Sequence, residues 1–144
     1  IQKYNGIPER GTGNSYFTYK MMDRVRTNSK AFCCMSDEEY IQYKDCKEKY
    51  PYYQEKLPNE IRLLCMDVAV IESSKNDNTA FFIIRLIPDS GRYTIIVPYA
   101  DSMHGLNSIA QTKRMKQLFY EFECDYMILD TQGVKCLRQL YNNI

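Results

Sequence analysis

The chain has 144 residues, of which 44% are apolar and 26% charged, as is typical of one soluble globular domain. Its 19 basic and 18 acidic residues leave a net charge of +1, which is lower than usual for a nonspecific DNA-binding domain. No apolar run reaches the ~18–20 residues of a membrane-spanning helix, and no signal peptide is recognisable, so we expect a protein that neither spans a membrane nor is secreted. Because the first residue is not Met, we expect a piece of a longer chain.

The N-terminal part, residues 1–59, is predicted to be a linker followed by a helical extension. Residues 1–15 hold three glycines and one proline, which favours a loose arm. Apolar residues four apart predict a helix over 17–26. Lys20, Arg24, Arg26 and Lys30 give this stretch a basic side.

A second helix of the extension has a clear start signal. Ser36 and Glu39 form the pattern of a capping box, which predicts a charged surface helix over about 37–49. The apolar residues 31–35 just before it are compatible with a short strand.

The main domain is predicted to cover residues 60–144, and its end begins a further helix. Its expected elements are strands over 61–67, 79–87 and 93–99, a helix over 108–123 and a strand over 126–129. A turn containing Gly91 joins the second and third strands as a hairpin. A right-handed crossover through the helix brings the last strand parallel to the first and beside it. The sequence therefore predicts an α/β fold with a mixed sheet: three antiparallel strands, then a parallel strand beside the first.

Six cysteines raise the question of disulfide bonds or a zinc site. The chain has no CxxC pair, Cys33 and Cys34 are adjacent, and Cys65 lies in a predicted core strand. We therefore predict reduced, buried thiols in a reducing compartment. The remaining cysteines are Cys46, Cys124 and Cys136.

Two apolar runs each end in an aspartate, Asp67 and Asp130. Runs of this kind are typical of strands buried on both faces, where an isolated carboxylate is costly unless it is paired or binds a metal. If the two strands are parallel neighbours, both carboxylates lie at the same edge of the sheet. Carboxylate oxygens suit Mg²⁺ or Mn²⁺, and paired ions can catalyse phosphodiester hydrolysis. The alternative is that Asp67 caps a turn and Asp130 opens a loop.

Three short motifs occur in order along the main domain. They are Asp67-Val68-Ala69, Asn76-Asp77-Asn78-Thr79-Ala80 and Asp130-Thr131-Gln132-Gly133. Together they resemble the C-terminal nuclease domain of the large terminase subunit of tailed bacteriophages, a family with a ribonuclease-H-like fold. The segments 102–105 and 113–118 are also similar to this family, and the resemblance covers about residues 14–134.

The resemblance implies a metal-dependent DNA endonuclease that cuts concatemeric viral DNA during genome packaging, by two-metal hydrolysis. Asp67 and Asp130 would be the catalytic metal ligands for Mg²⁺ or Mn²⁺. Asp77 would be an occasional ligand or a neighbour of the ligands, although it is equally well read as a turn residue. The implied partners are double-stranded DNA, an ATPase domain in the parent chain, a small terminase subunit and a portal. The implied location is the cytoplasm of a bacterial host.

The chain departs from the family in three respects. The family's third catalytic acid follows a fifth strand, and this chain ends before that strand, so no residue is assigned to the role. Val134 stands where the family tends to have a small residue. The chain also lacks a Walker A motif, so we expect no ATP hydrolysis by that mechanism.

Four residues are candidates for DNA contact: Lys113, Arg114, Lys116 and His104. The alternative for the first three is a solvated outer helix face. His104 is the only histidine, and no nucleophile motif surrounds it, which argues against catalysis by this residue.

Two other functions remain open. One is a catalytically incomplete module that acts in binding or assembly of the packaging motor. The other is a different nuclease of the same fold, of the resolvase or transposase type.

Overall fold

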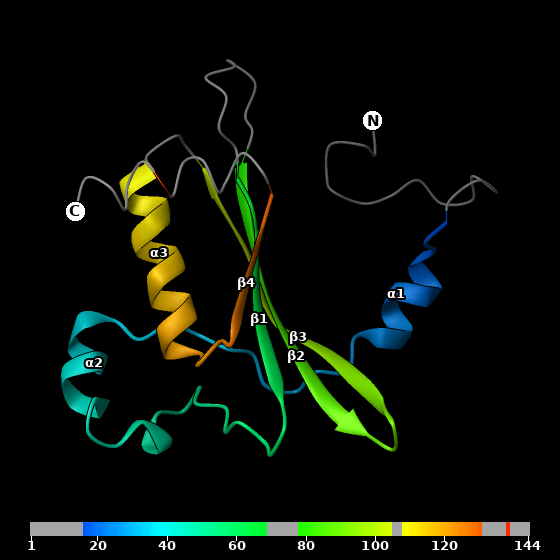
Figure 1. The fold of residues 1–144 in the computed structure, drawn as a ribbon, viewed down its shortest axis with the longest axis horizontal. Coiled ribbons are helices and arrows are strands. Elements are labelled where there is room, and N and C mark those ends of the chain that lie inside the picture. Colours follow the sequence, from blue (N-terminus) through cyan, green and yellow to red (C-terminus); the bar gives the residue numbers. More distant parts are fainter. Residues whose placement is uncertain (1–15, 69–77, 105–107, 131–137, 139–144) are drawn as a thin grey trace.

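The computed structural model describes residues 16–68, 78–104, 108–130 and 138 (Figure 1). The helices are α1 (Tyr19–Val25), α2 (Asp37–Tyr43), the 3-10 turn η2 (Lys47–Lys49) and α3 (Ser108–Glu121). The strands are β1 (Ile61–Asp67), β2 (Asn78–Asp89), β3 (Arg92–His104) and β4 (Tyr126–Leu129). In this part of the chain, no helix is long and apolar enough to cross a membrane.

The strands form one four-stranded mixed sheet in the order β3-β2-β1-β4. The β1–β2 and β2–β3 pairs are antiparallel, whereas β4 runs parallel to β1. The prediction of an α/β fold with a parallel strand beside the first is therefore confirmed. The bounds predicted for β1 and β4 are also confirmed, and α3 is the crossover between β3 and β4.

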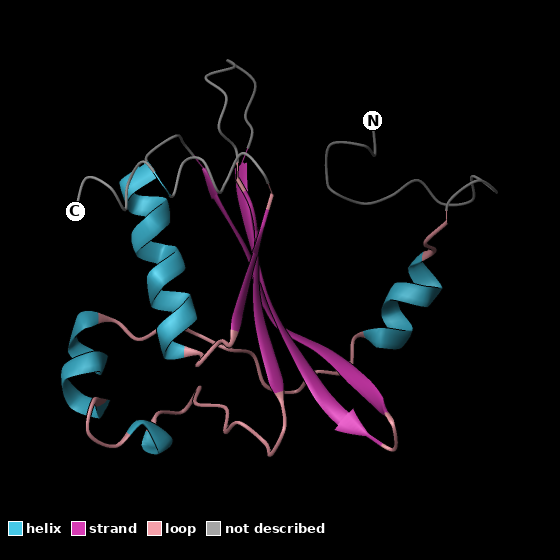
Figure 2. Cartoon of the chain, viewed as in Figure 1, coloured by secondary structure: helices cyan, strands magenta, loops and turns pink. Residues whose placement is uncertain are grey.

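Helix α3 covers one face of the sheet, and the main hydrophobic core lies between them (Figure 2). Met115 and Leu118 from α3 pack there on Leu64, Phe81 and other apolar side chains. Along β1 the side chains alternate between buried and partly exposed, so only the face toward α3 is fully buried. The prediction that this strand is buried on both faces is wrong, because the sequence alone does not show that one helical layer covers the sheet.

The hairpin between β2 and β3 closes through a two-residue turn. Ser90 and Gly91 have φ of 48° and 81°, as the type I′ turn of a right-handed twisted hairpin requires. Further along, the pairing passes from Ile83 opposite Tyr99 to Arg85 opposite Ile96. One residue of β2 thus opposes two of β3, which is a β-bulge.

Helix α1 is shorter than predicted and buries none of its residues. Thr18 is its N-cap and accepts a hydrogen bond from the Met21 amide. Phe17, Met21 and Val25, the apolar residues spaced four apart, are all exposed.

The capping box at Ser36 and Glu39 is confirmed, since each side chain bonds the backbone of the other residue. Helix α2 nevertheless ends at Tyr43, and the continuous helix predicted through residue 49 is wrong. The predicted strand over 31–35 is also absent. This segment still contacts the edge of the sheet, because the Phe32 amide donates to the Pro98 carbonyl of β3 at 3.0 Å.

Five free cysteines lie in the described residues, but only Cys124 is fully buried and Cys33 is exposed. Burial raises the pKa of Cys34 and of Cys124 to about 12, so both thiols stay protonated near neutral pH. The prediction of free thiols is confirmed for these five cysteines. The prediction that the thiols are buried is wrong for most of them. Cys136 lies outside the described residues.

A buried ionic cluster connects β1 and β2. Arg62 and Arg85 are directly opposite each other across these strands, where like charges repel. The Glu60 carboxylate, with a fully buried side chain, accepts hydrogen bonds from Nε of both arginines. Arg62 is 1% exposed, so its charge depends on this carboxylate.

The same cluster fastens the N-terminal extension to the sheet. The Gln54 carbonyl accepts from Arg62 Nη2 at 2.7 Å, and the Leu57 amide donates to Glu60 Oε2 at 2.8 Å. At the other end, Arg62 Nη1 donates to the Phe122 carbonyl at 3.0 Å. One buried guanidinium thus joins the extension, β1 and the end of α3.

Glu60 makes the stability of the protein dependent on acid pH. Burial opposes ionisation of this carboxyl, but hydrogen bonds from Arg85, Leu57 and Arg62 outweigh it and lower the pKa from 4.5 to about 2. The contribution is therefore complete above pH 4.5 and is lost as pH falls toward 2; the shift corresponds to about 3 kcal/mol. We expect the difference in unfolding free energy between the parent and Glu60→Gln to be constant from pH 5 to 7. Below pH 4.5, urea titrations should show this difference in unfolding free energy becoming smaller. A difference that stays constant down to pH 2 would contradict a lowered pKa of Glu60.

Candidate metal centre

Asp67 and Asp130 lie at the same end of neighbouring parallel strands. The register pairs Leu63 with Tyr126 and continues to Met66 with Leu129, the last pair. Asp67 follows Met66 on β1 and Asp130 follows Leu129 on β4, so the two aspartates lie opposite each other in the continued register. Neighbouring strands are about 4.8 Å apart. Figure 1 shows β1 and β4 side by side, and their register brings the two aspartates predicted as metal ligands together at one edge of the sheet.

Both aspartates are on the face of the sheet opposite α3. Asp67 continues the row of Leu63 and Cys65, and Asp130 continues the row of Tyr126 and Ile128. Both side chains are exposed. Contrary to the prediction, burial does not force these carboxylates to pair or to bind a metal; what favours a metal site is that they are adjacent.

The same edge of the sheet includes the ends of the other strands. Ser102 pairs with Ala80, and Ala80 pairs with Asp67, which gives one row across β3, β2 and β1. His104 ends β3 opposite Asn78. Asp77 lies outside the described residues.

The donor set suits a hard cation in its chemistry. Two neighbouring carboxylates offer oxygen ligands of the kind that Mg²⁺ and Mn²⁺ prefer. Within the described ranges, no cluster of three or more His, Cys, Asp or Glu side chains could hold an ion. Among His, Cys, Asp and Glu side chains of the described residues, this edge therefore provides no set of ligands larger than the two carboxylates.

The basic candidates on α3 lie on the other face of the sheet. Lys113 is exposed, and Lys116 is partly buried. Arg114 donates from Nη2 to the Tyr99 hydroxyl at 2.8 Å and lies 3.5 Å from Asp101 Oδ2. The structure therefore does not bring these residues together with the aspartate pair, and Arg114 is held by β3.

Tyr99, Asp101 and Arg114 form a cluster that the sequence patterns did not reveal. The Tyr99 hydroxyl donates to Asp101 Oδ2 at 2.9 Å. Burial, together with the nearby Asp101 charge, raises the pKa of Tyr99 to about 12. Although burial opposes it, the Tyr99 hydroxyl, the Ser102 amide and Arg114 lower the pKa of Asp101. The alternation of Tyr99, Asp101 and Met103 along an extended β3 is the signal that could have indicated this cluster.

Comparisons of the chain with protein-family models, with curated proteins and with solved structures found no match.

Proposed function

We propose that this chain is the nuclease portion of a phage large terminase, with a ribonuclease-H-like fold, and that it cuts double-stranded DNA with the help of divalent metal. The observation that supports the proposal most is the juxtaposition of Asp67 and Asp130 on neighbouring parallel strands. The order of the strands, three antiparallel and then one parallel to the first, is compatible with that fold.

In this proposal Asp67 and Asp130 hold Mg²⁺ or Mn²⁺. Such ions, when bound in pairs, activate water and stabilise the leaving oxygen of a phosphodiester. The two carboxylates neutralise part of the ionic charge and fix the ions at the edge of the sheet. Both side chains are exposed, so a DNA backbone can reach this edge from solvent.

Cleavage of supercoiled plasmid with Mn²⁺ tests the proposal. Asp67→Asn and Asp130→Asn should each reduce the rate by about 100-fold or more, the scale on which loss of one electrostatic group slows a reaction. Asp89→Asn is the matched control, because Asp89 is an exposed aspartate at the far end of β2, and this variant should cut like the parent. Parent-level cleavage by both site variants would exclude the assigned roles.

The first alternative is a binding and assembly module without catalysis. It is favoured by the lack, in the described residues, of a third acidic ligand beside the pair. Calorimetric titration with Mn²⁺ separates the two, because the nuclease predicts binding that Asp67→Asn and Asp130→Asn abolish. A docking module predicts no heat that depends on these carboxylates.

The second alternative is a nuclease of the resolvase or transposase type, which shares the expected fold. A resolvase requires branched DNA. Cleavage of plain linear duplex by the parent chain would count against it, whereas cleavage confined to four-way junctions would favour it.

A further inference from the structure

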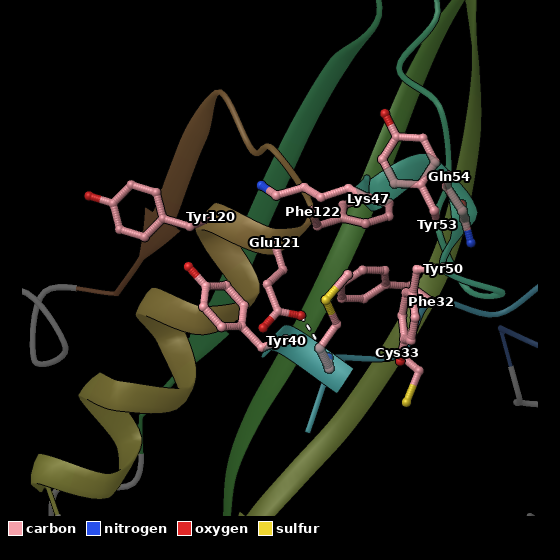
Figure 3. Close-up of a pocket in the computed structure, with 11 residues that line it drawn as sticks. Phe32, Cys33, Tyr40, Lys47, Tyr50, Tyr53, Gln54, Tyr120, Glu121 and Phe122 are labelled. Carbon is pink, nitrogen blue, oxygen red and sulfur yellow. Dashed lines mark hydrogen bonds between the residues drawn. The ribbon is translucent and has the colours of Figure 1, made fainter. Parts of the chain in front are cut away.

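A small pocket lies far from the aspartate pair, at the C-terminal end of α3 (Figure 3). Its volume is about 130 Å³. The Phe122 carbonyl beside it is hydrogen-bonded to Arg62, at the start of β1. Asp67 is five residues further along that strand, or about 17 Å at the usual rise of a strand. The pocket is therefore separate from the candidate metal centre.

Six aromatic rings make up most of the pocket wall: Phe32, Tyr40, Tyr50, Tyr53, Tyr120 and Phe122. Phe32, Tyr50 and Phe122 are buried and form the floor, whereas Tyr40 and Tyr120 are 52% and 66% exposed and stand at the mouth. A closed cavity of about 150 Å³ accommodates benzene. At about 130 Å³ this pocket is slightly smaller, but it opens to solvent at its mouth, so one planar ring can enter with part of its edge outside.

Contacts within the protein hold the residues of the floor in place. The rings of Phe32 and Phe122 are 4.5 Å apart, edge to face. The Tyr50 hydroxyl lies 3.4 Å from the Cys34 carbonyl and 3.3 Å from the Glu39 carboxylate, and its one hydrogen is shared between these two acceptors. Burial raises the pKa of Tyr50, so its hydroxyl stays neutral near neutral pH. A preformed apolar floor reduces the entropic cost of binding a flat ring.

The pocket also contains two opposite charges. The Glu121 carboxylate accepts from the Met35 amide at 2.8 Å and from Gln117 Nε2 at 3.0 Å, which fixes its position while leaving acceptor sites open. Figure 3 shows Glu121 entering the pocket from α3 and Lys47 crossing it from the other side. Lys47 makes no side-chain hydrogen bond or ion pair with the residues that the structure describes.

These charges select among ligands that fit an aromatic pocket. A quaternary ammonium group would gain from the rings and Glu121 but would be repelled by Lys47. A purely apolar ring would leave the acceptor sites of Glu121 covered and unused. A single heteroaromatic ring with an exocyclic amine and a nearby anionic group satisfies both charges.

We propose that this pocket binds the cytosine ring of a nucleotide, with its exocyclic amine donating to Glu121 and its phosphate near Lys47. Carboxylates accept from the cytosine amine in base recognition, and aromatic side chains stack on bases. The cytosine belongs either to a free cytidine nucleotide or to single-stranded DNA. The proposal does not depend on nuclease activity, so it is tested without divalent metal.

Calorimetry with cytidine monophosphate and uridine monophosphate tests the polar recognition. Uracil has a carbonyl oxygen where cytosine has the amine, and this oxygen would face the Glu121 carboxylate. We expect uridine monophosphate to bind at least about tenfold more weakly. Equal binding of the two, no binding of either, or choline or indole binding as tightly as cytidine monophosphate would overturn the proposal.

The octamers dC8 and dT8 identify the source of the ring. Much tighter binding of dC8 than of cytidine monophosphate supports single-stranded DNA, and binding of the mononucleotide alone supports a free nucleotide. Binding of dT8 as tight as that of dC8 contradicts cytosine recognition and indicates stacking without base selection.

Three variants assign the roles. Glu121→Gln should reverse the preference toward uridine monophosphate, because an amide can donate to the uracil oxygen. Tyr120→Ala should weaken binding about tenfold through lost stacking, with Tyr93→Ala, an exposed tyrosine of β3, as the unchanged control. Lys47→Met should weaken the binding of cytidine monophosphate but not that of cytidine, which has no phosphate. Tyr120 and Lys47 are exposed, so these two variants remain informative if Glu121→Gln does not fold; unchanged binding in both would contradict the assignment.

Discussion

Replacing Glu60 with alanine should lower the free energy of unfolding by about 3–5 kcal/mol, the range for breaking a buried ion pair from one side. The change leaves Arg62, 1% exposed, without its carboxylate and directly opposite Arg85. It also removes the acceptor of the Leu57 amide, which holds the extension against the sheet. The loss thus combines an uncompensated charge, repulsion between two arginines and an unpaired amide.

Urea denaturation measures this effect, with Glu55→Ala as the control. Glu55 is an exposed glutamate of the same segment, and we expect its replacement to change stability by less than about 0.5 kcal/mol. A loss below about 1 kcal/mol for Glu60→Ala would show that water or a rearranged side chain replaces the carboxylate.

Phe122→Ala is the second variant for which a large effect is expected, about 3–5 kcal/mol. Phe122 follows α3 directly and is 1% exposed. Its ring packs on Phe32 at 4.5 Å, and the Arg62 guanidinium lies 4.3 Å from its centroid. Truncation therefore leaves a cavity and removes a cation–π contact from a buried charge.

Thermal and urea unfolding should both show the loss, with an m-value close to that of the parent. Tyr120→Ala is the matched control, since Tyr120 is only two residues away and mostly exposed. A small loss for Phe122→Ala would mean that neighbouring side chains collapse into the vacated space.

The sheet could be predicted from the sequence because its signals are local. Apolar runs bounded by polar residues gave β1 and β4. The i, i+3, i+4, i+7 spacing of Met115, Leu118, Phe119 and Phe122 is typical of an amphipathic helix, and it accounts for both α3 and its buried side. The connection through one helix then required β4 to lie parallel to β1. The adjacency of Asp67 and Asp130 follows from this topology, so the candidate metal centre was within reach of sequence reasoning.

Long-range packing accounts for most of what the patterns missed. The break after α2 is at Cys46, whose φ of −149° and ψ of 57° are not helical, so the chain continues as the short turn η2 and not as one helix through residue 49. The sequence did not reveal the role of Arg62, which stands within an apolar run. Its partners Glu60, Gln54 and Arg85 come next to it only in the folded chain. The aromatic pocket likewise combines residues from three separate segments.

The bulge in β3 also affects how this sheet can meet other chains. Pro98 lies in the bulge on an edge strand and has no amide hydrogen to offer. Beside it, the carbonyls of Val97 and Pro98 already accept from Asn28 and from the Phe32 amide. An incoming β-strand would find the middle of this edge occupied, which protects β3 from intermolecular strand addition and from aggregation that begins there.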